Sequence, residues 1–189
     1  IVLLVISIVG IYEMRISGSL IEDMPKKEAF FEDIVFFEKE FDGVMPLEIM
    51  IDTKRKKGVM KLSTLRRMDE LEKTIDEIPE LSKPISIVNL VKYSKQAYYN
   101  GNPDYYDLPS SQEQSFILSY AKNATKNSKD NLMKSYVDST GQFARITTFM
   151  RDENGDNIAK IEAEIRKKAD KIFPPDQYKV TITGKALIF

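Results

Sequence analysis

The fold is most clearly indicated by the segment Pro46-Leu-Glu-Ile-Met-Ile-Asp52, in which apolar and polar side chains alternate. Leu47, Ile49 and Ile51 occupy every second position, so they share one face of an extended strand. Proline is tolerated at the first position of a strand. The segment therefore predicts the first strand of a sheet that is buried on one face.

The next segment along the chain, residues 62–78, carries the clearest helical pattern. Its apolar residues recur every three or four positions, which places them on one face of a helix. Ser63 or Thr64 can cap the start, and Pro79 ends the helix. The apolar face consists of Leu62, Leu65, Met68, Leu71, Ile75 and Ile78.

Further strands and helices are predicted along the rest of the chain. Apolar spacing predicts a short strand at residues 84–87, a strand at 142–150 that follows a hairpin turn at 139–141, a helix at 158–172 and a strand at 178–183. Strand, helix, strand, strand, helix, strand is the split βαβ arrangement of ferredoxin-like domains. We therefore predict an α+β fold whose two long helices cover one face of the sheet and leave the other for a neighbour.

Residues 88–133 are expected to form a helical insertion between two of these strands, with helices at 89–99 and around 112–123. Tyrosine combines apolar area with a polar hydroxyl, which suits contact with an amphiphile or a protein partner. Packing within the domain is the alternative. The candidate substrate-contact residues of the insertion are Tyr98, Tyr99, Tyr105, Tyr106, Phe116 and Tyr120.

A further helix is expected within residues 24–43. Phe30, Ile34, Phe37 and Phe41 follow one another at spacings of four, three and four, and so lie on one helical face. An aromatic stripe of this kind usually packs in a protein interior. We expect these side chains to be part of the core.

Residues 1–11 are uncharged and almost wholly aliphatic. A membrane-spanning helix needs about 20 such residues, so residues 1–15 are interpreted as the end of a transmembrane helix. A buried strand or a core helix is the alternative. Another apolar stretch begins at Ala186, and residues 16–189 are therefore expected to form an extracytoplasmic domain bounded by membrane-directed segments.

The composition excludes several classes of function. The 189 residues include no Cys and no His, which rules out zinc sites built from those residues and removes the commonest general base. A net charge of −1 gives no general attraction to nucleic acid. Phosphate-binding loops and nucleophile elbows are also missing from the sequence. We predict no enzymatic activity, no cofactor and no metal.

One stretch partly matches a calcium-binding loop. Asp152, Asn154 and Asp156 have the spacing of its first half, but Asn157 stands where the loop needs Gly and Ala163 where it needs Glu. A polar turn in which Asp156 caps the next helix explains the same residues.

The order and spacing of several segments are similar to those of a known protein family. These segments are Ile1 to Ile11, Gly18-Ser-Leu-Ile-Glu-Asp-Met-Pro25, Gly43-Val-Met-Pro-Leu-Glu48, Pro84-Ile-Ser-Ile-Val-Asn-Leu-Val-Lys92, Asp107-Leu-Pro109 and Val180-Thr-Ile-Thr-Gly184. Together they span nearly the whole chain. The sequence resembles the large periplasmic loop of the resistance-nodulation-division (RND) superfamily, in its lipid-exporter and Patched-like (MMPL) branch, and is more similar to the second loop than to the first.

The resemblance implies a porter domain with a ferredoxin-like core, on the periplasmic side of the bacterial inner membrane. In that family two such domains of one chain form a passage for hydrophobic or amphiphilic substrates, driven by proton or sodium flow. The implied partners are the second porter domain, the transmembrane helices of the same chain, the substrate and the membrane. A membrane-tethered sensor or adaptor domain and the periplasmic domain of an ABC-type permease are the alternatives.

Overall fold

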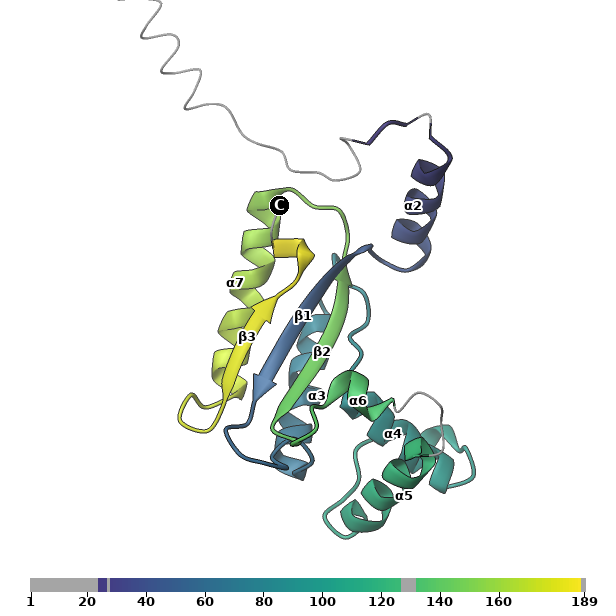
Figure 1. Ribbon diagram of the computed structural model, residues 1–189, viewed down its shortest axis with the longest axis vertical. Coiled ribbons are helices and arrows are strands. Elements are labelled where there is room, and N and C mark those ends of the chain that lie inside the picture. Colours follow the sequence, from purple (N-terminus) through teal and green to yellow (C-terminus); the bar gives the residue numbers. More distant parts are fainter. Residues whose placement is uncertain (1–23, 27, 127–131, 188–189) are drawn as a thin grey trace, which may run out of the picture.

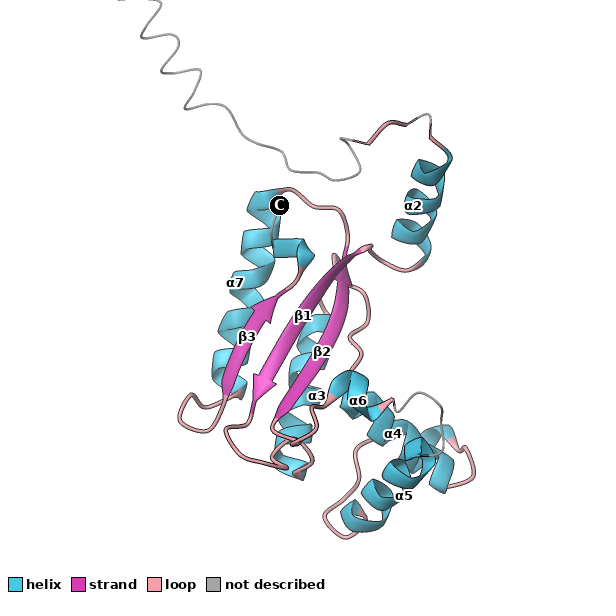
Figure 2. Ribbon diagram, in the orientation of Figure 1, coloured by secondary structure: helices cyan, strands magenta, loops and turns pink. Residues whose placement is uncertain are grey.

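The centre of the fold is a three-stranded antiparallel sheet in the order β2-β1-β3 (Figures 1 and 2). The computed structural model describes residues 24–26, 28–126 and 132–187. β1 spans Met45–Asp52, β2 spans Phe143–Met150 and β3 spans Lys179–Thr183. β1 pairs with β2 along its whole length and with β3 over its second half. The protein has an α+β fold, as the sequence predicts.

One face of this sheet is buried beneath helices α3 (Leu62–Asp76) and α7 (Gly155–Ile172), which lie behind the strands in Figure 1. Alternate residues of β1 and β2 point into that interior, while those between them are partly or fully exposed. The two helices contribute one apolar stripe each, as their periodicity predicts. Fully enclosed side chains of this core include Leu47, Ile49, Ile51, Leu65, Met68, Leu71, Ile146 and Ile165.

The strand predicted at residues 84–87 is not present. Leu81 and Ile85 instead form two isolated antiparallel bridges, with Met150 and Thr147 of β2 respectively. The segment thus runs along the outer edge of β2 without becoming a regular strand.

The cause lies in the start of helix α4 (Ile87–Tyr98). Ser86 Oγ accepts a hydrogen bond from the Val88 N–H at 2.9 Å, and the Ser86 N–H donates to Asn89 Oδ1 at 2.7 Å. These two bonds form a capping box that turns the chain into a helix. Pro84 also has no N–H to offer to a strand partner.

Helices α4, α5 (Gln114–Lys126) and α6 (Met133–Tyr136), with the 3-10 turn η1 (Pro103–Tyr105), lie beside the sheet on the side away from α7 (Figure 1). The helices predicted at 89–99 and around 112–123 correspond to α4 and α5. Residues 136–138, which would form the first arm of a hairpin around the predicted turn at 139–141, are not a strand, since Tyr136 ends α6 and Val137 makes a single bridge to Ala144.

Helix α2 (Ala29–Glu40) stands apart from the core at the start of β1 (Figure 1). Its aromatic stripe is exposed: Phe30 is 46%, Phe37 50% and Phe41 58% accessible, and only Ile34 is partly covered. The prediction that this stripe belongs to the core is wrong. Periodicity reveals that a helix has an apolar face, but not which surface covers that face.

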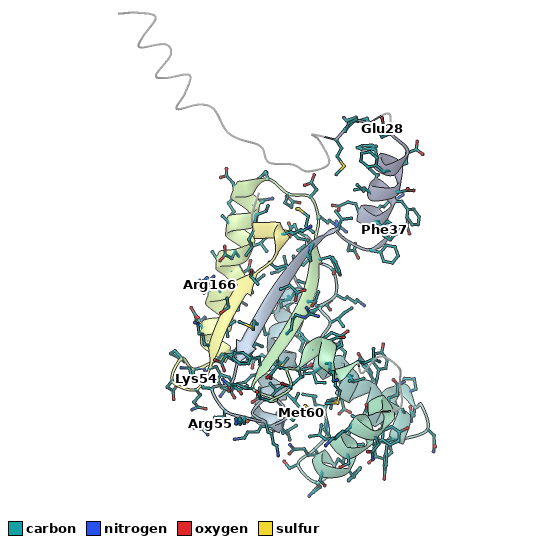
Figure 3. The ribbon with its side chains drawn as sticks, viewed as in Figure 1. Glu28, Phe37, Lys54, Arg55, Met60 and Arg166 are labelled. Carbon is teal, nitrogen blue, oxygen red and sulfur yellow. The ribbon has the colours of Figure 1, made fainter. Side chains whose placement is uncertain are left out.

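The chain enters and leaves the sheet at the same end. Gly43 lies against the backbone of Met150, and Gly184 lies against the Pro46 carbonyl, next to the start of β1. The 3-10 turn η2 (Lys185–Leu187) follows, with Ala186 fully buried. In Figure 3 the labelled Phe37 of α2 lies at this end, whereas Lys54 and Arg55 lie at the opposite end.

The end of a transmembrane helix predicted at residues 1–15 lies outside the described residues. Across the ranges 24–26, 28–126 and 132–187, no helix is both long enough and apolar enough to cross a membrane.

Candidate functional site

An apolar groove lies between α2 and the edge of the sheet. Its volume is about 680 Å³. Its walls come from three parts of the chain that are distant in sequence, namely the end of α2, the bridge-forming segment at 81–85 and the end of β2. The lining residues are Phe37, Phe41, Asp42, Gly43, Val44, Ser82, Lys83, Ile85 and Phe149.

Aromatic and aliphatic side chains form most of this lining. The rings of Phe37 and Phe41 stack with their centroids 5.2 Å apart, an arrangement that aromatic pairs favour. Phe149 and Ile85 face them from the uncovered side of the sheet and are 38% and 46% exposed. Apolar area of this extent remains in contact with water unless a ligand or a partner covers it.

A tight turn and two polar contacts position α2 over the groove. Asp42 and Gly43 both have positive φ values, of 57° and 136°, and they reverse the chain between α2 and β1. Asp42 Oδ1 accepts a hydrogen bond from Arg151 Nη2 at 2.5 Å. Glu38 Oε1 accepts one from the Asp152 N–H at 2.6 Å. Burial raises the pKa of Glu38, although this hydrogen bond acts in the opposite direction.

The polar groups in the groove differ in whether they already have partners. Asp42 is paired with Arg151. The Ser82 N–H donates to the Phe149 carbonyl at 2.8 Å, and the Phe149 N–H donates to Ser82 Oγ at 2.9 Å. Lys83 is exposed and, among the residues that the structure describes, no carboxylate lies within ion-pair distance of its ammonium.

The six aromatic residues predicted as substrate contacts lie elsewhere, on α4, η1 and α5, and none of them lines this groove. Five of the six form one cluster. The Tyr98 ring lies at its centre, with centroids 5.1 Å from Phe116, 5.7 Å from Tyr120 and 5.3 Å from Tyr99. Tyr99 stacks on Tyr105 at 4.2 Å. The helical spacing within α4 and α5 brings these rings to a common surface.

Tyr106 is the residue that this cluster does not include. Its ring packs against Tyr93 instead, at a centroid distance of 4.7 Å. Lys92 Nζ lies 5.7 Å from the same ring, within the range of a cation–π contact.

A nearly buried lysine on α4 anchors the segments that carry the aromatic cluster. Lys95 is 6% exposed, and its Nζ lies 2.7 Å from Asp107 and 3.4 Å from Glu113. The Tyr99 hydroxyl donates to Glu113 Oε1 at 2.8 Å, which raises the pKa of Tyr99 to about 12. Hydrogen bonds from the Ser110 N–H and from Tyr99 lower the pKa of Glu113 to about 2. These contacts hold η1 and the start of α5 against α4, so packing within the domain accounts for Tyr99.

A polar cavity of about 350 Å³ lies between α3 and α4. Glu72 in its wall is only 5% exposed and accepts a hydrogen bond from the Ser86 hydroxyl. Burial raises the pKa of Glu72 to about 7, although the hydrogen bond from Ser86 lowers it. Beside it, Asp69 forms ion pairs with Lys92 and Lys73.

The partial calcium motif forms a helix cap. Asn154 Oδ1 accepts a hydrogen bond from the Asn157 N–H at 2.9 Å, so Asn154 caps α7, and the predicted cap Asp156 belongs to the first turn. Within the described part of the chain, no three His, Cys, Asp or Glu side chains come together in a way that could hold a metal ion.

The sequence does not predict the groove as a site. Two of its features point toward it: an unusually aromatic stripe on α2, and Phe149 at a position on β2 that alternation assigns to the exposed face. No protein-family model matches the chain, and a search of curated protein sequences gives no significant match.

Proposed function

We propose that this chain is an extracytoplasmic porter domain of an RND-type exporter, in the MMPL and Patched-like branch, that passes hydrophobic or amphiphilic substrates. The observation that carries the proposal is the groove of about 680 Å³, with Phe37, Phe41 and Phe149 in its lining. Ligand sites of 300–1,000 Å³ with mainly apolar walls and a few polar groups are typical of small-molecule binding.

The arrangement of the strands supports the ferredoxin-like topology that belongs to this proposal. With the segment Leu81–Ile85 counted as the second strand, the order across the sheet is second, third, first, fourth, and all neighbours are antiparallel. Helix α3 then connects the first strand to the second, and helix α7 connects the third to the fourth, as in a split βαβ fold.

The places where the chain enters and leaves the sheet support attachment to a membrane. Gly184, which follows β3, lies against the start of β1, so both places are at one end of the sheet. This geometry suits a domain suspended between two membrane-directed segments. The exposed face of the sheet away from the groove, which includes Met50 at 41% exposure, is where the second porter domain of the same parent chain would pack.

Export by the full-length protein tests the proposal. Cells that carry it should export a fluorescently labelled amphiphile, and Phe149→Ser should reduce the rate by about tenfold, since it places a hydroxyl in the apolar wall of the passage. Phe36→Ser is the matched control, because Phe36 is 57% exposed and does not line the groove. Equal export by the wild type, by both variants and by cells without the protein would refute the proposal.

The full-length sequence provides a second test. An exporter of this class should contain about twelve apolar segments long enough to span a membrane, together with a second domain of similar pattern. One or two such segments joined to a cytoplasmic signalling domain would favour the sensor or adaptor alternative instead.

A further inference from the structure

The groove has a chemical polarity that its apolar lining alone does not reveal. Its lining includes two charged residues, Lys83 and Asp42, beside apolar side chains such as Ile85 and Phe149. A mainly apolar site with one unpaired charge in its lining distinguishes ligands by the group attached to their hydrocarbon part. The sign of that charge decides which amphiphiles bind.

Most acidic groups near Lys83 are engaged with other partners, and Asp76, which also lines the neighbouring polar cavity, is not within ion-pair distance of its ammonium. Asp42, the other charged residue of the lining, pairs with Arg151. Lys83 also borders the polar cavity between α3 and α4. There, Asp69 pairs with Lys92 and Glu72 accepts the hydrogen bond from Ser86. Among the described residues that line the groove, the ammonium of Lys83 is therefore the charged group that has no ion-pair partner and is available to a ligand.

The size of the groove restricts the apolar part of the ligand. A volume of about 680 Å³ matches sites that enclose one drug-sized molecule. One hydrocarbon chain fits such a space, with its methylene groups against the stacked rings of Phe37 and Phe41 and against Phe149. A double-chain phospholipid would leave much of its apolar surface outside.

We propose that the groove binds an anionic single-chain amphiphile of the fatty-acid type, with its carboxylate on the Lys83 ammonium and its chain along Phe37, Phe41, Ile85 and Phe149. The inference rests on the proposed function because it uses the same groove. It adds that the groove selects its ligands by the charge of their headgroup. An ammonium paired with a carboxylate gains energy from both charge and hydrogen bonding, whereas a cationic headgroup would be repelled.

Binding of two amphiphiles with the same tail tests this inference. Titration calorimetry of the full chain, below the micelle concentration, should give tighter binding of dodecanoate than of dodecyltrimethylammonium. Lys83→Gln should weaken dodecanoate binding by about fivefold, the upper range for a solvent-exposed ion pair. The affinity for the cationic amphiphile should stay unchanged or rise slightly. Lys83→Glu should reverse the preference. Lys179→Gln, which changes an exposed lysine on β3, is the control and should match the wild type.

Further outcomes separate the possible failures. Phe149→Ser should weaken the binding of both amphiphiles, because it alters the groove wall that contacts the hydrocarbon chain and leaves the charge of Lys83 unchanged. Equal affinity for the two headgroups, or dodecanoate binding that survives Lys83→Gln, would overturn the inference while leaving export by the full-length protein untouched. Charge-selective binding by a protein that exports nothing would sustain the inference and refute the exporter. Adsorption to phosphatidylcholine vesicles with no binding of free dodecanoate would also overturn it, in favour of a membrane surface.

Discussion

The Ser86 hydroxyl donates a hydrogen bond to the buried carboxyl group of Glu72, and the same oxygen accepts one from the Val88 N–H. One side chain thus joins the middle of α3 to the first turn of α4. The ion pair between Asp69 and Lys92 connects the same two helices. The position of α4, and with it the aromatic cluster, therefore depends on a joint that contains a titratable group.

Glu72 should make stability fall as pH rises. Its pKa is about 7 in the folded protein, against an ordinary value of 4.5, so the folded state binds more protons than the unfolded chain between these values. Stability is then lost progressively from about pH 4.5 to pH 7, by about 3 kcal/mol in all. Glu72→Gln should remove the part of this dependence that belongs to Glu72, leaving any part from Glu38, whose pKa is also raised by burial. It should raise the free energy of unfolding at pH 8, as measured by urea denaturation across the range.

The matched control for this measurement is Glu70→Gln, since Glu70 is exposed on the same helix. It should keep the wild-type pH dependence. Glu113 and Asp138, whose pKa values are lowered to about 2, act in the opposite direction, because they lose stabilisation only as pH falls below about 4.5. A wild-type stability that stays level from pH 4.5 to 8 would contradict the assignment to Glu72.

Gly43→Ala should destabilise the protein by more than about 2 kcal/mol. Gly43 has a φ of +136°, and an added Cβ would meet the carbonyl carbon and oxygen of Met150 at 2.5 Å. To relieve this steric clash, either the turn after α2 or the end of β2 would have to move. Gly155→Ala is the control, because a Cβ there meets nothing within 4 Å. Thermal unfolding of the two variants should differ clearly, and similar melting temperatures would be evidence against this tight approach.

The exposure of the α2 aromatics can be tested against the core. Phe36 is 57% exposed, so Phe36→Ser should change the free energy of unfolding by less than about 0.5 kcal/mol. Ile146 is fully buried in β2, and Ile146→Ala should cost about 2–5 kcal/mol. Denaturant titrations of both variants provide the comparison. A large loss for Phe36→Ser would contradict the exposure of the aromatic side chains of α2.

Lys95→Met should loosen the aromatic cluster. It keeps the length of the side chain but removes the ammonium that contacts Asp107 and Glu113, which should cost about 1–3 kcal/mol. The near-ultraviolet circular dichroism of the tyrosines should weaken, because the Tyr99–Tyr105 stack rests on this network. Lys160→Met, at an exposed position on α7, should change neither quantity. An unaltered tyrosine spectrum in Lys95→Met would contradict the anchoring role.

The elements that the sequence predicts well are those whose pattern is local. Leu65, Met68 and Leu71 mark one face of α3 by spacing alone, and alternation along β1 identifies its buried side. In each of these cases the residues that interact lie within a short stretch of chain.

The α+β class, the long helices and the buried side of the strands can therefore be predicted from the amino-acid pattern, because hydrophobic periodicity shows which face of an element avoids water. The surface that each face meets depends on how distant segments pack. The tertiary structure left the Phe37 stripe exposed, replaced the strand at residues 84–87 by two bridges and a capping box, and assembled the groove from Phe41, Lys83 and Phe149. Those contacts join residues far apart in the chain, and periodicity along a single segment carries no information about its partner.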